Sequence, residues 1–226
     1  MNSTQSNYRR IDTEEHIVIV RLSDGKNRLY NVHTYLASVG FTFNKRSAGN
    51  SFYEKEMTEE KASDWETFAK KNKLNIDIIP KEYMRSTDYR DTYFKNNRPV
   101  VEAKYRCAYC GKKIPFRETT IDHIFPINKL CYDPSVRKRA ARWGINGANE
   151  EKNLVTACKS CNSKKGTKMG IWIYKGFLGK SESFWIFRKG IRILGIIAII
   201  LLLSKLYIDA QAPNTFADIS SIFQFS

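Results

Sequence analysis

The chain has 226 residues, of which 42% are hydrophobic, and this apolar content can supply a core for one ordinary domain or for two small ones. The composition therefore excludes a chain that is disordered throughout. Lys and Arg number 38 against 23 Asp and Glu, and the net charge of +15 favours a polyanionic partner, either nucleic acid or an anionic membrane surface. Charge alone does not choose between these partners, and a basic surface that only keeps the protein soluble stays an alternative.

The first residues, MNSTQSNYRR, lack the apolar stretch of a secretory signal, so nothing in them directs the chain to an oxidising compartment. A cytosolic location also suits the cysteines, because four of the five fall into two C-x2-C pairs. That spacing is typical of a metal site and not of disulfide pairing. We therefore expect the bulk of the chain in the reducing cytosol.

Residues 1–80 have the pattern of a small α+β domain. In chain order we expect strands at residues 16–22, 51–57 and 75–79, a helix at residues 30–39, and a second helix that Thr58 caps. Trp65 and Phe68 fall on one face of the second helix, together with two alanines, and are expected to pack in a core. The order β-α-β-α-β predicts a compact sheet backed by two helices. No residue marks a catalytic site here, so the role of the domain, including the protein partner that it could bind, stays open.

Residues 81–104 are polar, rich in Tyr and Arg, and interrupted by Asn96-Asn97 and Pro99. This pattern predicts a linker or an extended arm. Four of its basic residues can contact phosphates, namely Arg85, Arg90, Lys95 and Arg98. A solvated linker without such contacts fits the same residues.

The two cysteine pairs are Cys107 with Cys110, in CAYCGKKI, and Cys158 with Cys161, in ACKSCNSKKG. Gly111 suits the tight turn that a C-x2-C metal loop needs. Two such pairs supply the four soft ligands of a closed tetrahedral Zn²⁺ site. Because the protein would fill all four positions, such a zinc is structural, and the chemistry must come from other residues.

The segment from about Tyr105 to Lys168 resembles the HNH nuclease family, whose ββα-metal fold often carries a zinc ribbon of this kind. The resemblance rests on positions in the family's order: Cys107, Cys110, Asp122-His123 in TIDHIFPINKL, Asn153 in NLVTAC, and Cys158, Cys161 and Asn162 in CKSCNSKKG. It implies a nuclease module at residues 105–175 that hydrolyses DNA. The family often has His where Asn162 stands, so this chain would be an H-N-N variant.

The resemblance also implies roles for these residues. His123 would be the general base, since a neutral imidazole can take a proton from water near neutral pH. Asp122 would bind a divalent cation, and Asn162 would complete that site with its amide oxygen. Oxygen ligands favour Mg²⁺ or Mn²⁺ over zinc or nickel. Asn153 would hydrogen-bond the loop backbone and keep His123 aimed at the water.

Basic residues around this motif are candidates for DNA binding. Lys164, Lys165 and Lys168 fall on the expected final helix of the module, where they can meet the phosphate backbone. Arg137, Arg139 and Arg142 lie beside Trp143 in the insert between His123 and Asn153, a combination that suits a DNA groove. A solvated helix face is the alternative for the lysines. The fifth cysteine, Cys131, is expected to be a small buried hydrophobic residue.

The C-terminal part, residues 176–226, contains the apolar run IRILGIIAIILLLSKLYI at residues 191–208. As a helix this run would span roughly 27 Å, close to the minimum for a bilayer. Its basic residues lie mostly before the run, which predicts a single-pass anchor with the N-terminus in the cytoplasm. A buried or oligomer-forming helix is the alternative, and a lipid bilayer is the partner that the anchor implies.

Taken together, these patterns predict an α+β protein: the small N-terminal domain, then a zinc-stapled ββα-metal module, then a hydrophobic C-terminal helix. The resemblance predicts a metal-dependent endonuclease acting on DNA, and the anchor places it at the cytoplasmic face of a membrane. Restriction or phage defence is the role that this pairing suggests. Two alternatives stay open: a zinc ribbon that binds nucleic acid without catalysis, and a membrane-anchored adaptor.

Overall fold

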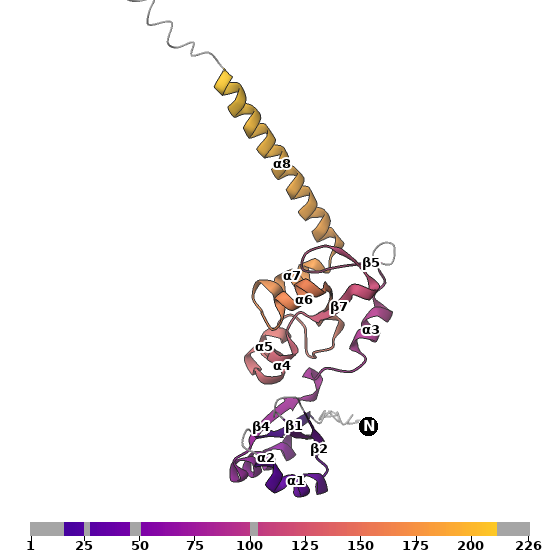
Figure 1. Cartoon of the computed structure of the whole chain (residues 1–226), viewed down its shortest axis with the longest axis vertical. Helices are drawn as coiled ribbons and strands as arrows, with labels where there is room; N and C mark the ends of the chain where they lie inside the picture. Colours follow the sequence, from indigo (N-terminus) through magenta and orange to yellow (C-terminus); the bar gives the residue numbers. More distant parts are fainter. Residues whose placement is uncertain (1–15, 25–27, 46–50, 100–103, 212–226) are drawn as a thin grey trace, which may run out of the picture.

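The structure is a computed structural model that describes residues 16–24, 28–45, 51–99 and 104–211. Figure 1 shows three parts in chain order: a small sheet domain, a module of short helices and strands, and a long helix that projects from the module. The N-terminal part is rich in strands, the four paired cysteines lie together in the module, and the final helix is apolar. The predicted α+β architecture is confirmed.

The N-terminal domain is an antiparallel sheet in the order β2-β3-β1-β4. Its strands are β1 (Ile17–Ser23), β2 (Thr42–Asn44), β3 (Phe52–Thr58) and β4 (Asn75–Pro80), and its helices are α1 (Leu29–Ser38) and α2 (Glu59–Asn72). Val18, Val20 and Leu22 alternate along β1 and are buried, as one face of a pleated strand requires. The strand β2 is an addition to the predicted order, because three residues are too short to show a period.

The segment after this sheet is not an extended linker in its described part, which corrects that prediction. It contains the 3-10 turn η2 (Lys81–Tyr83) and the helix α3 (Tyr89–Asn96). Tyr93 of α3 packs in one cluster with Ile121 and Leu154 of the following module. The Arg90 guanidinium donates to the Thr119 carbonyl at 3.0 Å. Aromatic residues within this otherwise polar segment therefore pack α3 against the module.

The module is built on two two-stranded antiparallel sheets and four short helices. The strands are β5 (Lys104–Arg106), β6 (Lys113–Pro115), β7 (Thr119–His123) and β8 (Leu154–Cys158), with 3-10 turns η3 (Phe116–Glu118) and η4 (Glu151–Asn153) before β7 and β8. The helices are α4 (Ile127–Tyr132), α5 (Pro134–Ala141), α6 (Lys159–Lys165) and α7 (Ile171–Gly179). Strand β7 pairs antiparallel with β8, and Asp122 stands opposite Val155. Together β7, β8 and α6 form the expected ββα unit.

The sheet domain and the module share an interface. Arg21 of β1 is buried and donates to the Tyr132 hydroxyl at 2.9 Å and to Glu54 at 3.0 Å. Cys131 is buried, as expected, and its thiol donates to the Tyr83 carbonyl at 3.3 Å. Ile79 of β4 belongs to the hydrophobic core of the module. These contacts fix the sheet domain against α4.

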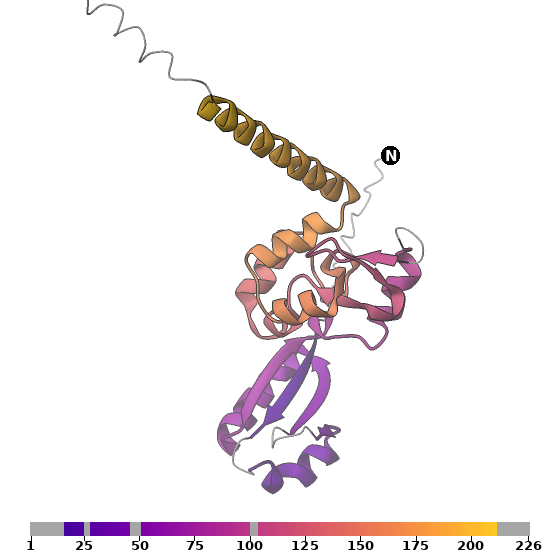
Figure 2. The same cartoon turned by 45° about the horizontal axis from the view of Figure 1, so that its top comes forward.

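The helix α8 (Glu182–Gln211) has 30 residues and stands clear of the other described elements in both views (Figures 1 and 2). Its most apolar window has a mean hydropathy of 2.3, with none of it buried. Among the described residues the first turns of α8 contact the module: Glu182 pairs with Arg106 through two hydrogen bonds of 2.9 Å, and the Trp185 ring lies against Gly111. The helix is long and apolar enough to cross a membrane by length and composition.

Candidate active site

The four paired cysteines form one cluster, with their Sγ atoms all within 4.8 Å of one another. Cys107 and Cys110 lie on the turn after β5, Cys158 ends β8, and Cys161 is in the first turn of α6. A tetrahedral zinc–thiolate site has sulfur–sulfur edges of about 3.8 Å, so the cluster needs only a small contraction to hold zinc. The chemistry of the donors and their spacing fit this metal.

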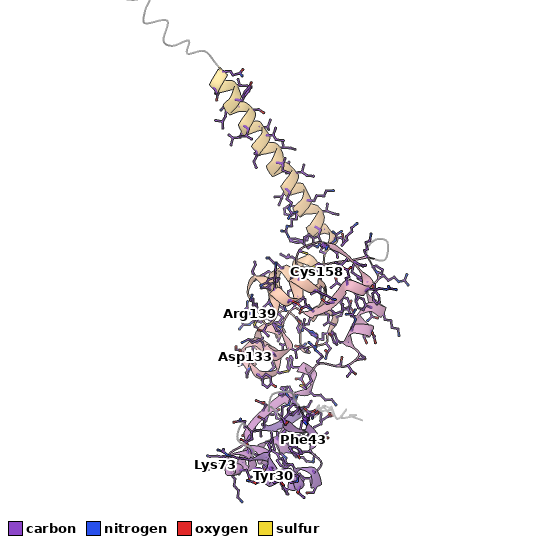
Figure 3. The ribbon with its side chains drawn as sticks, in the orientation of Figure 1. Tyr30, Phe43, Lys73, Asp133, Arg139 and Cys158 are labelled. Atoms are coloured by element: carbon purple, nitrogen blue, oxygen red, sulfur yellow. The ribbon has the colours of Figure 1, made fainter. Side chains whose placement is uncertain are left out.

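The backbone around Cys107 fixes this turn, here called the cysteine knuckle (residues 107–111). Gly111 has a positive φ of 79°, and its amide donates to the Cys107 carbonyl at 2.8 Å. The Ala108 amide donates to the Thr156 carbonyl at 2.9 Å, which joins the knuckle to β8. Figure 3 labels Cys158 in the part of the module from which α8 departs. The knuckle therefore lies between the ββα unit and the base of the long helix.

Asp122 faces α6 and the knuckle. Its Oδ2 atom accepts a hydrogen bond of 2.5 Å from the Tyr109 hydroxyl. The same atom forms an ion pair of 3.0 Å with the Lys165 ammonium. Asn162 of α6 donates through Nδ2 to the Thr120 hydroxyl at 3.1 Å. Because alternate residues of a strand share a face, Thr120 and Asp122 lie on the same side of β7. Asn162 thus lies over the strand face that carries Asp122.

His123 faces the opposite side of β7, toward α3. Its side chain is 3% exposed, and its ring lies 5.0 Å from the ring of Tyr89. Burial, which is the larger cause, and the positive charge of Arg85 together lower the pKa of His123 to about 4. The Nε2 atom is buried and has no hydrogen-bond partner among the described residues. At neutral pH this side chain is an uncharged imidazole with a nitrogen free to accept a proton.

Asn153 is fully buried and holds the backbone that follows His123. Its Oδ1 accepts from the Phe125 amide at 2.8 Å, and its Nδ2 donates to the carbonyls of Ala148 at 2.8 Å and of Phe125 at 3.3 Å. Its own carbonyl accepts from the Ile124 amide at 2.7 Å. Asn153 therefore fixes the exit of the chain from β7, through its carbonyl at Ile124 and its side chain at Phe125.

Lys165 does not lie on an exposed helix face, which corrects its prediction as a phosphate contact. The side chain is fully buried, and its ammonium donates to the His123 carbonyl at 2.7 Å as well as pairing with Asp122. Burial lowers the pKa of Lys165, and the negative charge of Asp122 opposes that shift. Lys164 and Lys168 are exposed. Lys165 is three positions after Asn162, so both fall on the helix face that meets β7.

The arginines of the insert differ in exposure. Arg137 donates to the carbonyls of Leu130 and Cys131, each at 3.0 Å, and its guanidinium lies over the Tyr83 ring. This side chain therefore stabilises the packing of α4 and α5. Arg142 is exposed, and Arg139 is labelled on α5 in Figure 3, apart from Cys158. Among the described residues, the side chains that act on Asp122 are Tyr109 and Lys165 and those that act on His123 include Arg85, and these arginines of the insert are not among them.

Three residues beside the candidate site were not singled out from the sequence. Tyr109 stands inside the first cysteine pair, and burial together with the charge of Asp122 raises its pKa, so it stays a neutral donor. Tyr89 lies against His123. The Asn149 side chain also contacts His123, while its Nδ2 donates to the Met84 carbonyl at 2.6 Å. For Tyr109 alone the sequence holds a signal, its position between two metal ligands.

We expect the purified protein to contain zinc, and replacement of Cys110 and Cys161 by Ser to remove it. The loss should abolish cooperative unfolding of the module, because a structural zinc site contributes on the order of 10 kcal/mol of apparent binding free energy. Metal analysis and thermal unfolding measured by circular dichroism check both effects. Cys131→Ala is the matched control and should keep its zinc. An unchanged zinc content in the double variant would contradict the assignment.

Comparisons with known proteins point to one family. The model of the HNH endonuclease family matches residues 107–168, a segment that contains the cysteine cluster, Asp122, His123, Asn153 and Asn162. The CRISPR-associated endonuclease Cas9 of Corynebacterium diphtheriae is 37% identical over 68 residues, which are 30% of this chain and 5% of that protein. No solved structure is significantly similar to the chain. Residues 107–168 therefore form an HNH endonuclease domain within this chain.

Proposed function

We propose that this chain is a metal-dependent endonuclease that hydrolyses DNA phosphodiester bonds at a centre formed by Asp122, His123 and Asn162. One observation carries the proposal: a neutral imidazole with an unpaired nitrogen directly follows a carboxylate in the sequence of β7, within the segment that matches the HNH family. The similar segment of Cas9 belongs to a protein named as an endonuclease. Asn153 supports the centre by holding the backbone after His123.

In this proposal His123 is the general base. Its lowered pKa keeps the imidazole uncharged at neutral pH, and in the tautomer that carries its proton on Nδ1 the Nε2 atom can take the proton of the attacking water. Nε2 is buried, and a water molecule reaches it only after surrounding side chains, Tyr89 among them, move. Binding of the DNA backbone near Arg85, which is exposed, is the event that we expect to accompany this movement.

Asp122 and Asn162 are the residues that would hold a divalent cation. Tyr109 and Lys165 both bind Oδ2 of Asp122, and the Asn162 amide nitrogen is bound to Thr120, so one oxygen of each side chain has no partner among the described residues. Two such oxygen donors suit Mg²⁺ or Mn²⁺. A cation bound there would supply positive charge for the scissile phosphate and the leaving oxygen.

The remaining parts have supporting roles in the proposal. Zinc on the four cysteines is structural, because the protein fills all four positions. Of the six basic residues predicted to bind DNA in the module, four remain candidates for contact with the DNA backbone, namely Lys164, Lys168, Arg139 and Arg142. The nuclease unit extends upstream to include α3, which packs against β7 and β8. The N-terminal sheet would position this unit or bind a partner.

We propose further that α8 anchors the enzyme in a membrane. Its apolar window is uncovered by the rest of the described chain, and exposed apolar surface of this extent is stable only in lipid or against another protein. Arg188, Lys189 and Arg192 lie at the end that joins the module, which favours a cytoplasmic nuclease. Such an enzyme would meet DNA at the inner face of the membrane, as in restriction or phage defence.

Cleavage of supercoiled plasmid tests the nuclease proposal. The detergent-solubilised protein should nick the plasmid with Mg²⁺ or Mn²⁺, and His123→Ala should be slower by roughly 10²- to 10⁴-fold, because the general base is lost. Buffer without divalent ions is the metal-free arm, since a chelator would also attack the zinc site. Gel separation of nicked and linear products gives the rates.

His33→Ala is the matched control, because His33 is exposed and lies on α1, outside the nuclease unit. It should cleave like the parent protein. A parent protein that is folded, contains zinc and binds DNA without cutting it would overturn the proposal and favour a non-catalytic nucleic-acid-binding module.

Cell fractionation tests the anchor. The parent protein should remain in the membrane fraction after alkaline carbonate washing. Ile199→Lys with Ile200→Lys should release it, because each lysine at the centre of a membrane helix costs about 3 kcal/mol. The same pair of lysines at Thr42 and Phe43, exposed on β2, is the control and should leave the protein membrane-bound. Recovery of the parent protein in the soluble fraction without detergent would contradict the anchor.

A further inference from the structure

We propose that Lys165 is a resident cation that neutralises Asp122 in the metal-free enzyme and thereby weakens the binding of the divalent ion. The inference rests on the proposed function, because it takes Asp122 as a ligand of that ion. It goes beyond the proposed function because it names a residue that sets the affinity of the centre for the divalent ion. This residue is neither a metal ligand nor a phosphate contact.

The burial of Lys165 is the first observation. Its side chain is 1% exposed, although lysine almost never lies fully buried without a partner. The ammonium is 3.0 Å from Asp122 Oδ2 and 2.7 Å from the His123 carbonyl oxygen. A positive charge is thus held directly beside the carboxylate, under cover of α6, where water screens it little.

The different charges of the two groups that bind Asp122 are the second observation. Tyr109 and Lys165 bind the same oxygen, Oδ2. The Tyr109 phenol is neutral, so it orients the carboxylate without changing the charge of the site. Lys165 brings a full positive charge to the place where the divalent ion would add two more. The ammonium and a divalent ion bound to the same carboxylate would repel each other, and water screens that repulsion little in a buried site. By Coulomb's law the repulsion is large enough to weaken binding of the ion about tenfold or more.

A purely structural role for Lys165 makes a different prediction. The ammonium also ties the end of β7 to α6 through the His123 carbonyl, so its loss should lower stability in either case. A structural role alone predicts that metal binding stays equal or weakens as the site loosens. A resident cation predicts that metal binding tightens, because the carboxylate is left without its internal counter-ion.

The experiment measures Mn²⁺ affinity directly, by electron paramagnetic resonance of free Mn²⁺, in the zinc-loaded full-length protein in detergent. We expect Lys165→Met to bind Mn²⁺ at least about tenfold more tightly than the parent protein. We also expect a lower melting temperature without Mn²⁺ and a larger rise when Mn²⁺ is added. Asp122→Asn defines the binding that belongs to other sites.

Lys164→Met is the matched control. It removes the same charge from the same helix, but Lys164 is exposed, so Mn²⁺ affinity should stay within about twofold of the parent value. Lys165→Gln is measured in parallel, because it keeps a donor for the His123 carbonyl while removing the charge. It should also tighten Mn²⁺ binding if Lys165→Met fails to fold.

The outcomes separate this inference from the proposed function. Equal or weaker Mn²⁺ binding in folded Lys165 variants, with a parent protein that binds Mn²⁺ and nicks DNA, would overturn the resident cation and leave the nuclease standing. A parent protein that shows no Asp122-dependent Mn²⁺ binding and no cleavage would overturn the nuclease, and the inference with it. Tighter binding in both Lys165 variants, with Lys164→Met unchanged, supports the proposal.

Discussion

The cluster of four thiols is the constraint on which the rest of the module depends. It brings the knuckle after β5 against the first turn of α6, two segments that are far apart in the sequence. Cys161 is followed at once by Asn162, so the cluster sets how α6 meets β7. Tyr109 lies between Cys107 and Cys110 and donates to Asp122. A metal bound to the cysteines would therefore order the carboxylate as well as the fold.

The two faces of β7 carry different chemistry. On one face a carboxylate, an ammonium and a phenol form a closed set of charge-assisted contacts around Asp122. On the other face His123 is kept uncharged by burial under α3. Asn153 fixes the turn where these faces end. Because the first turn of α8 lies beside Gly111, the same knuckle also joins the proposed nuclease centre to the long apolar helix, which would hold the centre close to a membrane.

Local patterns in the sequence were enough to find the cysteine pairs, the Asp122-His123 motif and the apolar run of α8. The cysteine pairs and the apolar run are readable from spacing and composition, and the Asp122-His123 motif from the resemblance to the HNH family. The burial of Lys165 could not be predicted from the sequence. The rotation of α6 about its axis decides which of its lysines faces β7, and only tertiary packing sets that rotation. The helix α3 was missed for a related reason: Tyr93 and Phe94 lie in a stretch that is otherwise polar. The roles of Tyr89 and Asn149 likewise depend on that helix and its approach.

A crystal structure of the His123→Ala protein with Mn²⁺ and a short DNA duplex would test the central claim most directly. The account predicts one anomalous peak within bonding distance of Asp122 Oδ1, the Asn162 side-chain oxygen and a phosphate oxygen. The space vacated by the His123 ring should lie beside a water molecule in line with the scissile bond. A bound duplex with no anomalous peak at Asp122, or with its backbone remote from β7, would contradict it.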